Sequence, residues 1–306
     1  MTGAHSFGIT PPAYRLPVET RLGPIHLQVA DLSRSAAYYR DVLGLRVFTS
    51  EGGISQLGAT PAAAGTATSA RRTLIVLHEH PGAAPVVPRK RFGLFHLAIL
   101  LPTRAALGQL LMHLVARHEP AGMSDHAVSE AIYLTDPDGH GLEIYADRPR
   151  NLWQSHDQQL TMASEPLDAR AVMADAHGDA WREAPEGTII GHVHLHVGAL
   201  DEAARFYHDA LGFDKTVWDY PGALFLAAGG YHHHVGINTW ARNGVAPPPT
   251  EARLLEWTIE LPTRSDIAAL ASSCATHHVP YTWDADSLVL HDPWGTAVRI
   301  SPIMSP

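Results

Sequence analysis

The sequence has a single cysteine, no long apolar run and fewer basic than acidic residues. Cys274 alone cannot form an internal disulfide, which agrees with a reducing compartment. No stretch approaches the roughly 20 apolar residues of a membrane span, and the N-terminus lacks a basic start followed by an apolar run. With 22 Lys and Arg against 31 Asp and Glu, the chain has a net charge of -9, which argues against binding to a nucleic acid. We therefore expect a cytoplasmic location, with neither a membrane nor a nucleic-acid partner.

What the chain does contain is apolar residues and histidine. At 306 residues and 45% hydrophobic, it is long enough to bury a sizeable core, which we expect to be divided between two domains. The 21 histidines hint at metal chemistry, but composition alone cannot assign a ligand. The positions of the histidines in the sequence have to show which of them are candidate ligands.

The sequence also repeats itself. Residues 23–45 match residues 191–213, with His26 aligned on His194. LPTR occurs at 101–104 and again at 261–264, and the turn motif of residues 135–139 recurs at 291–295. We infer an α+β fold of four βαβββ modules in two tandem pairs.

The expected segments follow from these repeats. They are an N-terminal extension at 1–21, a metal-bearing domain at 22–149 (modules 22–91 and 92–149), a linker at 150–188 with a short helix around 167–176, and a degenerate domain at 189–306 (modules 189–252 and 253–306).

A hairpin near the end of the first half carries a carboxylate of interest. Asp-Pro-Asp-Gly at 136–139 is a strong turn signal between two strand-like stretches. Glu143 lies between Leu142 and Ile144, so its side chain points to the face opposite the two apolar ones. A buried carboxylate requires a hydrogen-bonding partner, a base or a metal.

The four modules resemble the vicinal oxygen chelate superfamily, which includes glyoxalases, antibiotic-resistance proteins and extradiol ring-cleavage dioxygenases. The resemblance implies that each pair of modules forms a curved, barrel-like mixed sheet with helices outside. It also implies metal ligands on the first strand of each module and on the last strand of the second, here His26, His96 and Glu143. Such a set suits a divalent metal with open positions, although a single histidine in an apolar strand is more often a hydrogen-bonded core residue than a ligand.

The second half offers an internal comparison. Its equivalents of the three ligands are His194, Glu256 and Arg299, and an arginine cannot bind a cation. We therefore predict that this half is a degenerate structural domain. The alternative is a second metal site that uses His194, Glu256 and the run of histidines at 232–234.

The spacing of His126, Tyr133, Asp136, Gly139 and Glu143 resembles the motif of extradiol dioxygenases, and specifically the two-domain bacterial catechol 2,3-dioxygenases. This resemblance implies Fe(II), with Mn(II) accepted by the same ligands, together with O₂ and a small aromatic diol that is opened to a semialdehyde in aromatic catabolism. Tyr133 would hydrogen-bond the substrate and His126 would hold a proton. The alternatives are a tyrosine packed at a sheet edge and a surface histidine near a turn.

Two other functions remain open within this fold. A glyoxalase-type isomerase or lyase usually has a fourth protein ligand, and Val76 stands where we would look for it. A non-catalytic drug-binding resistance protein would need no metal. The sequence is compatible with a homo-oligomer.

Overall fold

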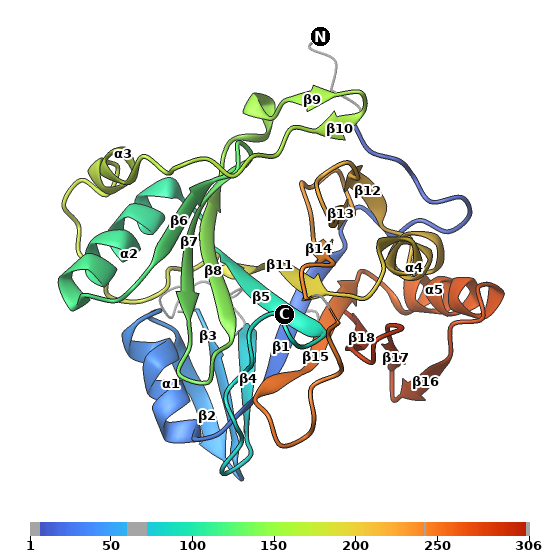
Figure 1. Cartoon of the computed structure of the whole chain (residues 1–306), viewed down its shortest axis with the longest axis horizontal. Helices are drawn as coiled ribbons and strands as arrows, with labels where there is room; N and C mark the ends of the chain where they lie inside the picture. The colour runs from blue at the N-terminus through green and yellow to red at the C-terminus, as the bar shows by residue number, and fades with distance from the viewer. Residues whose placement is uncertain (1–6, 60–71, 242, 304–306) are drawn as a thin grey trace.

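The computed structural model describes residues 7–59, 72–241 and 243–303, and the other parts of the predicted segments lie outside these ranges. The described chain forms two eight-stranded curved sheets with helices around their outer sides (Figure 1). The α+β fold class is confirmed.

Each of the four modules is a strand, a helix and three further strands, as the repeats predict. The first module contains β1 (Arg21–Val29), α1 (Leu32–Asp41), β2 (Arg46–Glu51), β3 (Ile54–Gly58) and β4 (Thr73–Glu79). The second contains β5 (Gly93–Leu100), α2 (Arg104–Arg117), β6 (Gly122–Asp125), β7 (Ser129–Thr135) and β8 (Gly141–Asp147). The third contains β11 (Ile189–His196), α4 (Leu200–Ala204) with a π-helical continuation at Arg205–Ala210, β12 (Asp214–Val217), β13 (Ala223–Ala227) and β14 (Val235–Asn238). The fourth contains β15 (Arg253–Leu261), α5 (Arg264–Thr276), β16 (Tyr281–Asp284), β17 (Ser287–His291) and β18 (Ala297–Pro302).

The modules do not share sheets with their neighbours in sequence. One sheet has the strand order β16-β17-β18-β15-β1-β4-β3-β2 and therefore joins the first module to the fourth. The other has the order β12-β13-β14-β11-β5-β8-β7-β6 and joins the second module to the third. We expected modules one and two to form one sheet, and the structure corrects that pairing. The repeats show where each module begins and ends. They do not show which modules pair, because the free edge of each first strand can pair with the first strand of any other module.

The register of the two central strand pairs follows this arrangement. β1 and β15 are antiparallel, with His26 opposite Glu256. β5 and β11 are antiparallel, with His96 opposite His194. His26 and His96 therefore belong to different sheets.

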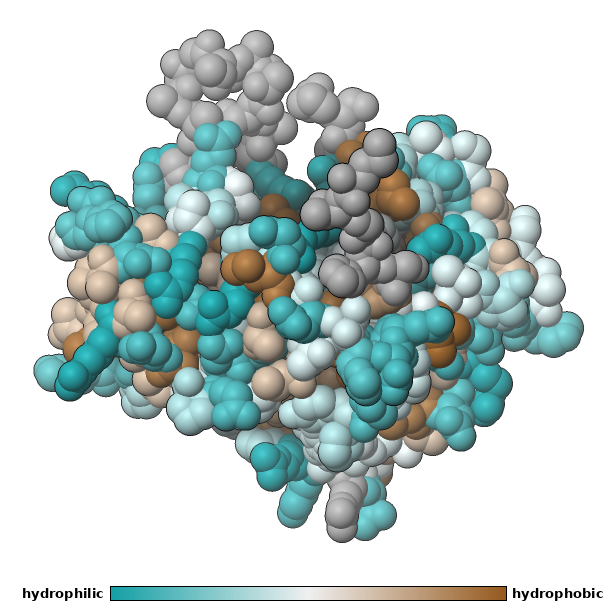
Figure 2. Space-filling model, turned by 90° about the horizontal axis from the view of Figure 1, so that it is seen from above, coloured by the Kyte–Doolittle hydropathy of each residue, from teal (hydrophilic) through white to brown (hydrophobic). Residues whose placement is uncertain are grey.

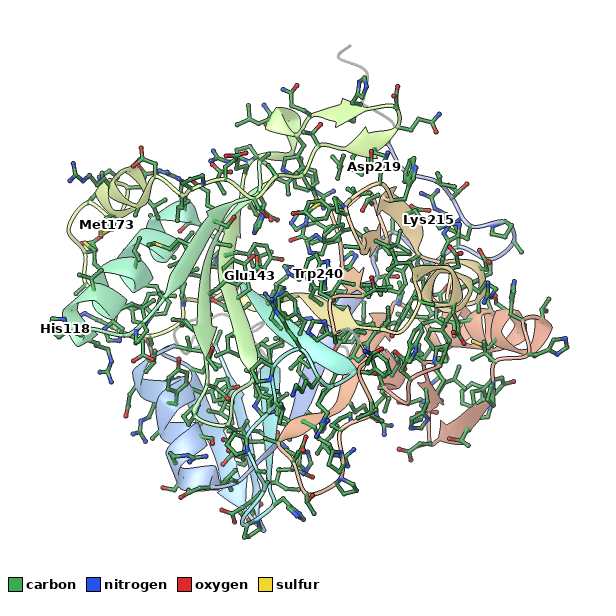
Figure 3. The ribbon with its side chains drawn as sticks, in the orientation of Figure 1. His118, Glu143, Met173, Lys215, Asp219 and Trp240 are labelled. Atoms are coloured by element: carbon green, nitrogen blue, oxygen red, sulfur yellow. The ribbon has the colours of Figure 1, made fainter. Side chains whose placement is uncertain are left out.

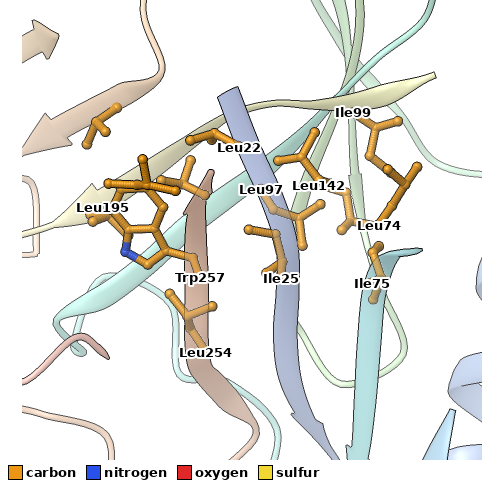
Figure 4. Close-up of a cluster of buried hydrophobic side chains, with 14 of the residues drawn as sticks. Leu22, Ile25, Leu74, Ile75, Leu97, Ile99, Leu142, Leu195, Leu254 and Trp257 are labelled. Atoms are coloured by element: carbon orange, nitrogen blue, oxygen red, sulfur yellow. The ribbon is translucent and has the colours of Figure 1, made fainter. Parts of the chain in front are cut away.

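The largest hydrophobic cluster of the described residues contains buried side chains from both sheets (Figure 4). Ile25 and Trp257 contribute from one sheet, and Leu97, Leu142 and Leu195 contribute from the other. Each of these residues has a polar neighbour in its strand, and successive strand residues point to opposite faces. The apolar faces thus pack together, and the polar residues of β5, β8 and β11 are left for the concave face of their sheet.

The repeated LPTR segments begin helices. The Thr103 side chain caps α2 by accepting a hydrogen bond from the Ala106 amide. The Thr263 side chain likewise accepts from the Asp266 amide at the start of α5, and the Asp266 carboxylate accepts from the Thr263 amide. Caps of this kind satisfy amides that the helix itself leaves free.

The repeated turns join neighbouring modules. Asp136 begins the β7–β8 turn, and its Oδ2 accepts a hydrogen bond of 3.0 Å from the Tyr39 hydroxyl of α1. Asp292 makes the same 3.0 Å contact with Tyr207. In the first of these turns Gly139 has φ +90°, a conformation that glycine adopts without steric cost.

The linker contains a 3₁₀ turn at Arg150–Leu152, the short hairpin β9 (Ser155–His156) and β10 (Gln159–Leu160), and α3 (Ala169–Ala174), which falls inside the predicted short helix. It is fastened to the second module, because Arg104 at the start of α2 donates to Asp175 at 2.6 Å. On the face seen in Figure 2, hydrophobic residues form small patches separated by hydrophilic ones. No helix in the described part of the chain has both the length and the apolar content to cross a membrane.

Candidate metal centre and its cavity

Three polar side chains converge on the concave face of the second sheet. His96 comes from β5, Glu143 from β8 and His192 from β11, and these strands are neighbours in the order β11-β5-β8. The Oε2 atom of Glu143 lies 3.0 Å from His96 Nε2 and 3.2 Å from His192 Nε2, and the two Nε2 atoms are 3.3 Å apart. All three side chains are buried.

These distances fit a metal ion. Bonds of about 2.1 Å separate two ligand atoms by roughly 3.0 Å at right angles and by roughly 3.4 Å at tetrahedral angles. The observed separations of 3.0 to 3.3 Å lie between these limits, and the shortest matches one edge of an octahedron. Two imidazoles and one carboxylate on one face would leave the opposite positions open for other ligands.

The protonation states also suit a cation. Burial alone would raise the pKa of Glu143, but His192 and His96 hold the pKa well below its usual range. Burial lowers the pKa of His192 to about 4, against the raising effect of Glu143. Near neutral pH the site therefore presents an ionised carboxylate and a neutral His192, the forms in which these groups bind metals.

The structure brings His96 and Glu143 together as expected, but it places His26 elsewhere. His26 lies on the concave face of the other sheet, where its Nδ1 is 3.0 Å from His78 Nε2. The cause is the module pairing, because β1 pairs with β15 and not with the strands that carry His96 and Glu143. His26 is therefore not a ligand of this centre.

Our sequence reasoning missed His192, which completes the set. The repeat aligns His26 with His194, whereas the position that aligns with His192 is Pro24, so the repeat predicts no ligand there. The signal that could have found it is the alternation His192, His194 and His196, which places three imidazoles on one face of a single strand.

The other concave face carries a different arrangement. There, Arg299 donates to Glu256 at 2.7 Å and to Asp284 at 2.8 Å. Glu256 is thus paired with an arginine, and it also acts on the nearby His26 and His78, whose pKa its charge raises against the larger lowering effect of burial. His194 and Glu256, which we had considered together for a second site, lie in different sheets.

A cavity of about 300 Å³ opens beside the triad. Five aromatic side chains supply much of its wall: Phe95, Tyr133, Tyr220, Phe225 and Trp240. Figure 3 shows Glu143 and Trp240 on opposite sides of the space between the central strands of this sheet and the β13–β14 region. Flat apolar walls around a cation suit a planar ring that carries polar groups at one end.

His126 and Tyr133 both line this cavity and bond to each other. The Tyr133 hydroxyl is 2.6 Å from His126 Nε2, and His126 Nδ1 is 2.6 Å from the Ala163 carbonyl oxygen. A carbonyl only accepts, so Nδ1 carries the proton and Nε2 of the neutral ring accepts from Tyr133. Burial, followed by the charge of Glu143, raises the pKa of Tyr133, which keeps the phenol protonated.

The histidine run of the third module reaches the same cavity. Asp147 Oδ1 accepts from His232 Nε2 at 2.9 Å, and His232 Nδ1 is 2.7 Å from His233 Nδ1. Because the carboxylate fixes the proton of His232 on Nε2, His232 Nδ1 is the acceptor and His233 Nδ1 donates to it. His233 Nε2 is then left without a proton, on a ring whose centroid is 4.0 Å from that of His192.

His194 also lines the cavity. Its Nε2 is buried and makes no hydrogen bond with any described residue. Burial lowers the pKa of His194 well below its usual range, and His96 and His192 lower it further. The result is a neutral imidazole with an unsatisfied ring nitrogen beside the triad.

Fold and site together define a class: a protein of four βαβββ modules with an inward set of two histidines and a carboxylate on one of its two sheets. The family model of the Glyoxalase/Bleomycin resistance protein/Dioxygenase superfamily matches residues 21–144 and 189–289. The chain belongs to this superfamily, and the expected membership is confirmed.

Individual relatives agree with this assignment. A protein of Bacillus subtilis (strain 168) named catechol-2,3-dioxygenase is 41% identical over 258 residues, which cover 83% of this chain and 87% of that protein. This match confirms the expected resemblance to an enzyme of the catechol 2,3-dioxygenase type.

Solved structures share the fold at low identity. A crystal structure of a Bacillus subtilis subsp. subtilis str. 168 protein, provisionally named a dioxygenase, has a TM-score of 0.63 at 13% identity and covers 94% of this chain and 86% of its own. A crystal structure of a glyoxalase I mutant from Zea mays has a TM-score of 0.54 at 15% identity, and the match covers 92% of this chain and 94% of that one.

Proposed function

We propose that the protein is an Fe(II)-dependent extradiol dioxygenase that opens the ring of a catechol or substituted catechol to give a semialdehyde. The observation that carries the proposal is the triad of His96, Glu143 and His192 facing a cavity walled by aromatic rings. The 41% identity to a protein named catechol-2,3-dioxygenase supports it.

Iron held by this triad would bind both the diol and O₂ and would allow electrons to pass from the diol to O₂. Two neutral imidazoles and one carboxylate leave a divalent ion with a net positive charge, which favours an anionic diol. Mn(II) accepts the same ligands.

Tyr133 and His126 form the path for the first proton. As a substrate hydroxyl loses its proton to the oxygen of Tyr133, the Tyr133 hydroxyl passes its own proton to His126 Nε2. His126 becomes an imidazolium whose Nδ1–H remains bonded to the Ala163 carbonyl. The proton is thereby held at a defined atom and can return to the ring-opened product.

His233 has the arrangement of a base on the other side of the triad. Asp147 and His232 fix its tautomer, so that Nε2 can accept a proton within the cavity. Fixing an imidazole through a second imidazole and a carboxylate is a positioning effect, which keeps the accepting nitrogen in place before the reaction begins.

The experiment uses protein stripped of metal and reconstituted anaerobically with Fe(II). Addition of catechol and air-saturated buffer should give a yellow ring-opened product and consume O₂ in equal molar amount. The same preparation of His192→Ala should give no product, whereas His26→Ala should remain active. Activity that is lost in His26→Ala and retained in His192→Ala would overturn the proposed site.

Two other functions would give different results. A glyoxalase-type isomerase usually needs a fourth protein ligand. Among the described residues, only three side chains, those of His96, Glu143 and His192, lie close enough together to bind one ion. Conversion of a hemithioacetal without O₂ uptake would indicate that chemistry. Tight binding of an unchanged aromatic compound by metal-free protein would indicate a resistance protein.

A further inference from the structure

A second cavity lies where all four modules meet. Its volume is about 250 Å³, and none of the metal triad lines it. It is bounded by the β4–β5 connection, the β14–β15 connection and the turns that follow β7 and β17. The two connections run together through bridges between Ala84 and Glu251 and between Arg91 and Val245.

The wall of this cavity is positively charged. Arg89, Arg91 and Arg253 line it, and none of the described aspartates and glutamates does, although the chain as a whole carries a net charge of -9. Arg91 is neutralised, because its guanidinium binds Glu251 through two bonds of 2.6 and 2.7 Å. The other two arginines are not neutralised in this way.

Arg253 and Arg89 have no hydrogen-bonding or ionic partner for their side chains among the described residues. The Nε atom of Arg253 is buried and unpaired. A buried donor without a partner costs free energy, so such an atom indicates a missing acceptor. Arg89 is exposed and close enough to His196 to act on its ionisation.

The rest of the wall combines a ring nitrogen with aromatic surface. His196 donates from Nδ1 to Asn238 Oδ1 at 2.6 Å, so its Nε2 is uncommitted. Phe92 and Trp294, whose ring centroids are 6.3 Å apart, line the cavity together with Phe95. The wall thus places the unpaired guanidinium groups of two arginines beside aromatic rings.

We propose that this cavity binds a small aromatic carboxylate. A guanidinium matches a carboxylate through two parallel hydrogen bonds, and the rings would pack against the body of the ligand. Phe95 also forms part of the wall of the metal-site cavity, so an occupant would contact a ring that both cavities share. The proposal does not rest on the dioxygenase reaction, because Arg89, Arg253 and His196 belong neither to the triad nor to the cavity beside it.

The test is calorimetric titration of the metal-free full-length protein with benzoate, and with benzamide as its uncharged counterpart. We expect one benzoate per chain and binding of benzamide weaker by about tenfold or more, because the amide carries no charge for the arginines. Arg253→Met and Arg89→Gln should each weaken benzoate binding by about tenfold. Arg264→Gln, which removes an exposed arginine paired with Asp286, should leave it unchanged.

Fluorescence locates the ligand. Trp294 lines this cavity and Trp240 lines the metal-site cavity. A benzoate-induced change in emission should disappear in Trp294→Phe and persist in Trp240→Phe. The exposed position of Arg89 provides a variant that does not depend on core packing if Arg253→Met fails to fold. Equal affinity for benzoate and benzamide, undiminished binding in Arg89→Gln, or a signal lost only in Trp240→Phe would each overturn the proposal.

Discussion

His96 and His192 extend from two antiparallel strands toward one point on the same concave surface, with their Nε2 atoms 3.3 Å apart. These strands come from modules that are separated by the whole linker. The contact exists only because the second module pairs with the third. Glu143 on β8 lies within hydrogen-bonding distance of both nitrogens, so the pairing of β11 with β5 adds the third ligand to the two that the second module supplies.

The first prediction tests whether His192 or His26 is a metal ligand. His192→Ala should lower the affinity of the metal-free protein for Fe(II) or Mn(II) by on the order of a hundredfold or more, because one of three ligands is lost. His26→Ala should bind the metal as the unaltered protein does. Anaerobic titration followed by metal analysis measures both. Equal losses in the two variants would contradict the assignment of the site to one sheet.

A second prediction concerns Tyr133. Tyr133→Phe removes the hydroxyl that bonds His126 and should lower kcat by roughly a hundredfold, a typical contribution of a positioned acid or base. Metal content should be unchanged, since the ring itself remains. Tyr281→Phe, in the fourth module, serves as the matched control. A Tyr133→Phe enzyme with full kcat would show that the phenol only packs in the wall.

The third prediction addresses the chain from Asp147 through His232 to His233. His232→Gln should lower kcat by about tenfold to a hundredfold, because His233 loses the partner that fixes its tautomer. It should also change the shape of the pH–rate profile, which a purely structural loss would not do. His156→Ala, an exposed histidine, is the control. If iron content falls in parallel with kcat, the change acts on the metal and the positioning role is refuted.

Acid should destabilise the metal-free protein through its buried histidines. Burial lowers the pKa of His234 to about 3 and that of His192 to about 4. Between these values and the ordinary histidine pKa of about 6.5, the unfolded chain binds protons that the folded chain does not. The free energy of unfolding should therefore be highest above pH 6.5 and should fall as the pH drops, by up to about 1.4 kcal/mol per pH unit for each such histidine.

Urea denaturation at a series of pH values measures this dependence. The variant His234→Gln should show a shallower fall on the acid side than the unaltered protein. Stability that rises on acidification from pH 6.5 to 4.5 would contradict the predicted sign.

The two equivalent turn aspartates should differ in their effect on stability. Asp136 is buried and paired with His140 Nδ1 at 2.9 Å, and burial would raise its pKa but His140 lowers it below the usual value. Asp292 has Thr296 in place of that histidine, and burial raises its pKa. Asp136→Asn should cost about 3–5 kcal/mol, since it leaves a buried histidine without its counter-ion.

For Asp292→Asn the expected cost is about 1–2 kcal/mol, the range of weakened neutral hydrogen bonds. Equilibrium denaturation of both variants gives the comparison. A larger loss for Asp292→Asn would mean that the Asp136–His140 pair contributes less than its burial suggests.

Much of the local structure was predictable from the sequence. The alternation of Leu142, Glu143 and Ile144 placed the carboxylate on the face opposite the core, and Asp-Pro-Asp-Gly placed the turn before it. These features depend on residues within a few positions of one another. The LPTR repeat likewise marked two helix starts, each capped by its threonine.

The choice of ligand was not predictable from the repeat. His26 and His194 align in sequence, yet neither belongs to the triad, and His192 has a proline at its aligned position in the first module. Nothing in the sequence indicated the contact between His232 and Asp147, because that contact joins segments from two different modules.

The sequence by itself determined four repeated modules, the inward face of each strand and the identity of the residues on it, since these follow from periodicity along the chain. Only the tertiary structure decided that module one pairs with four and two with three, and hence that His192 and not His26 joins His96 and Glu143. The physical reason is that each first strand has an unpaired edge that any of the other modules can satisfy with the same backbone hydrogen bonds. The selection among them is made by the packing of the whole molecule.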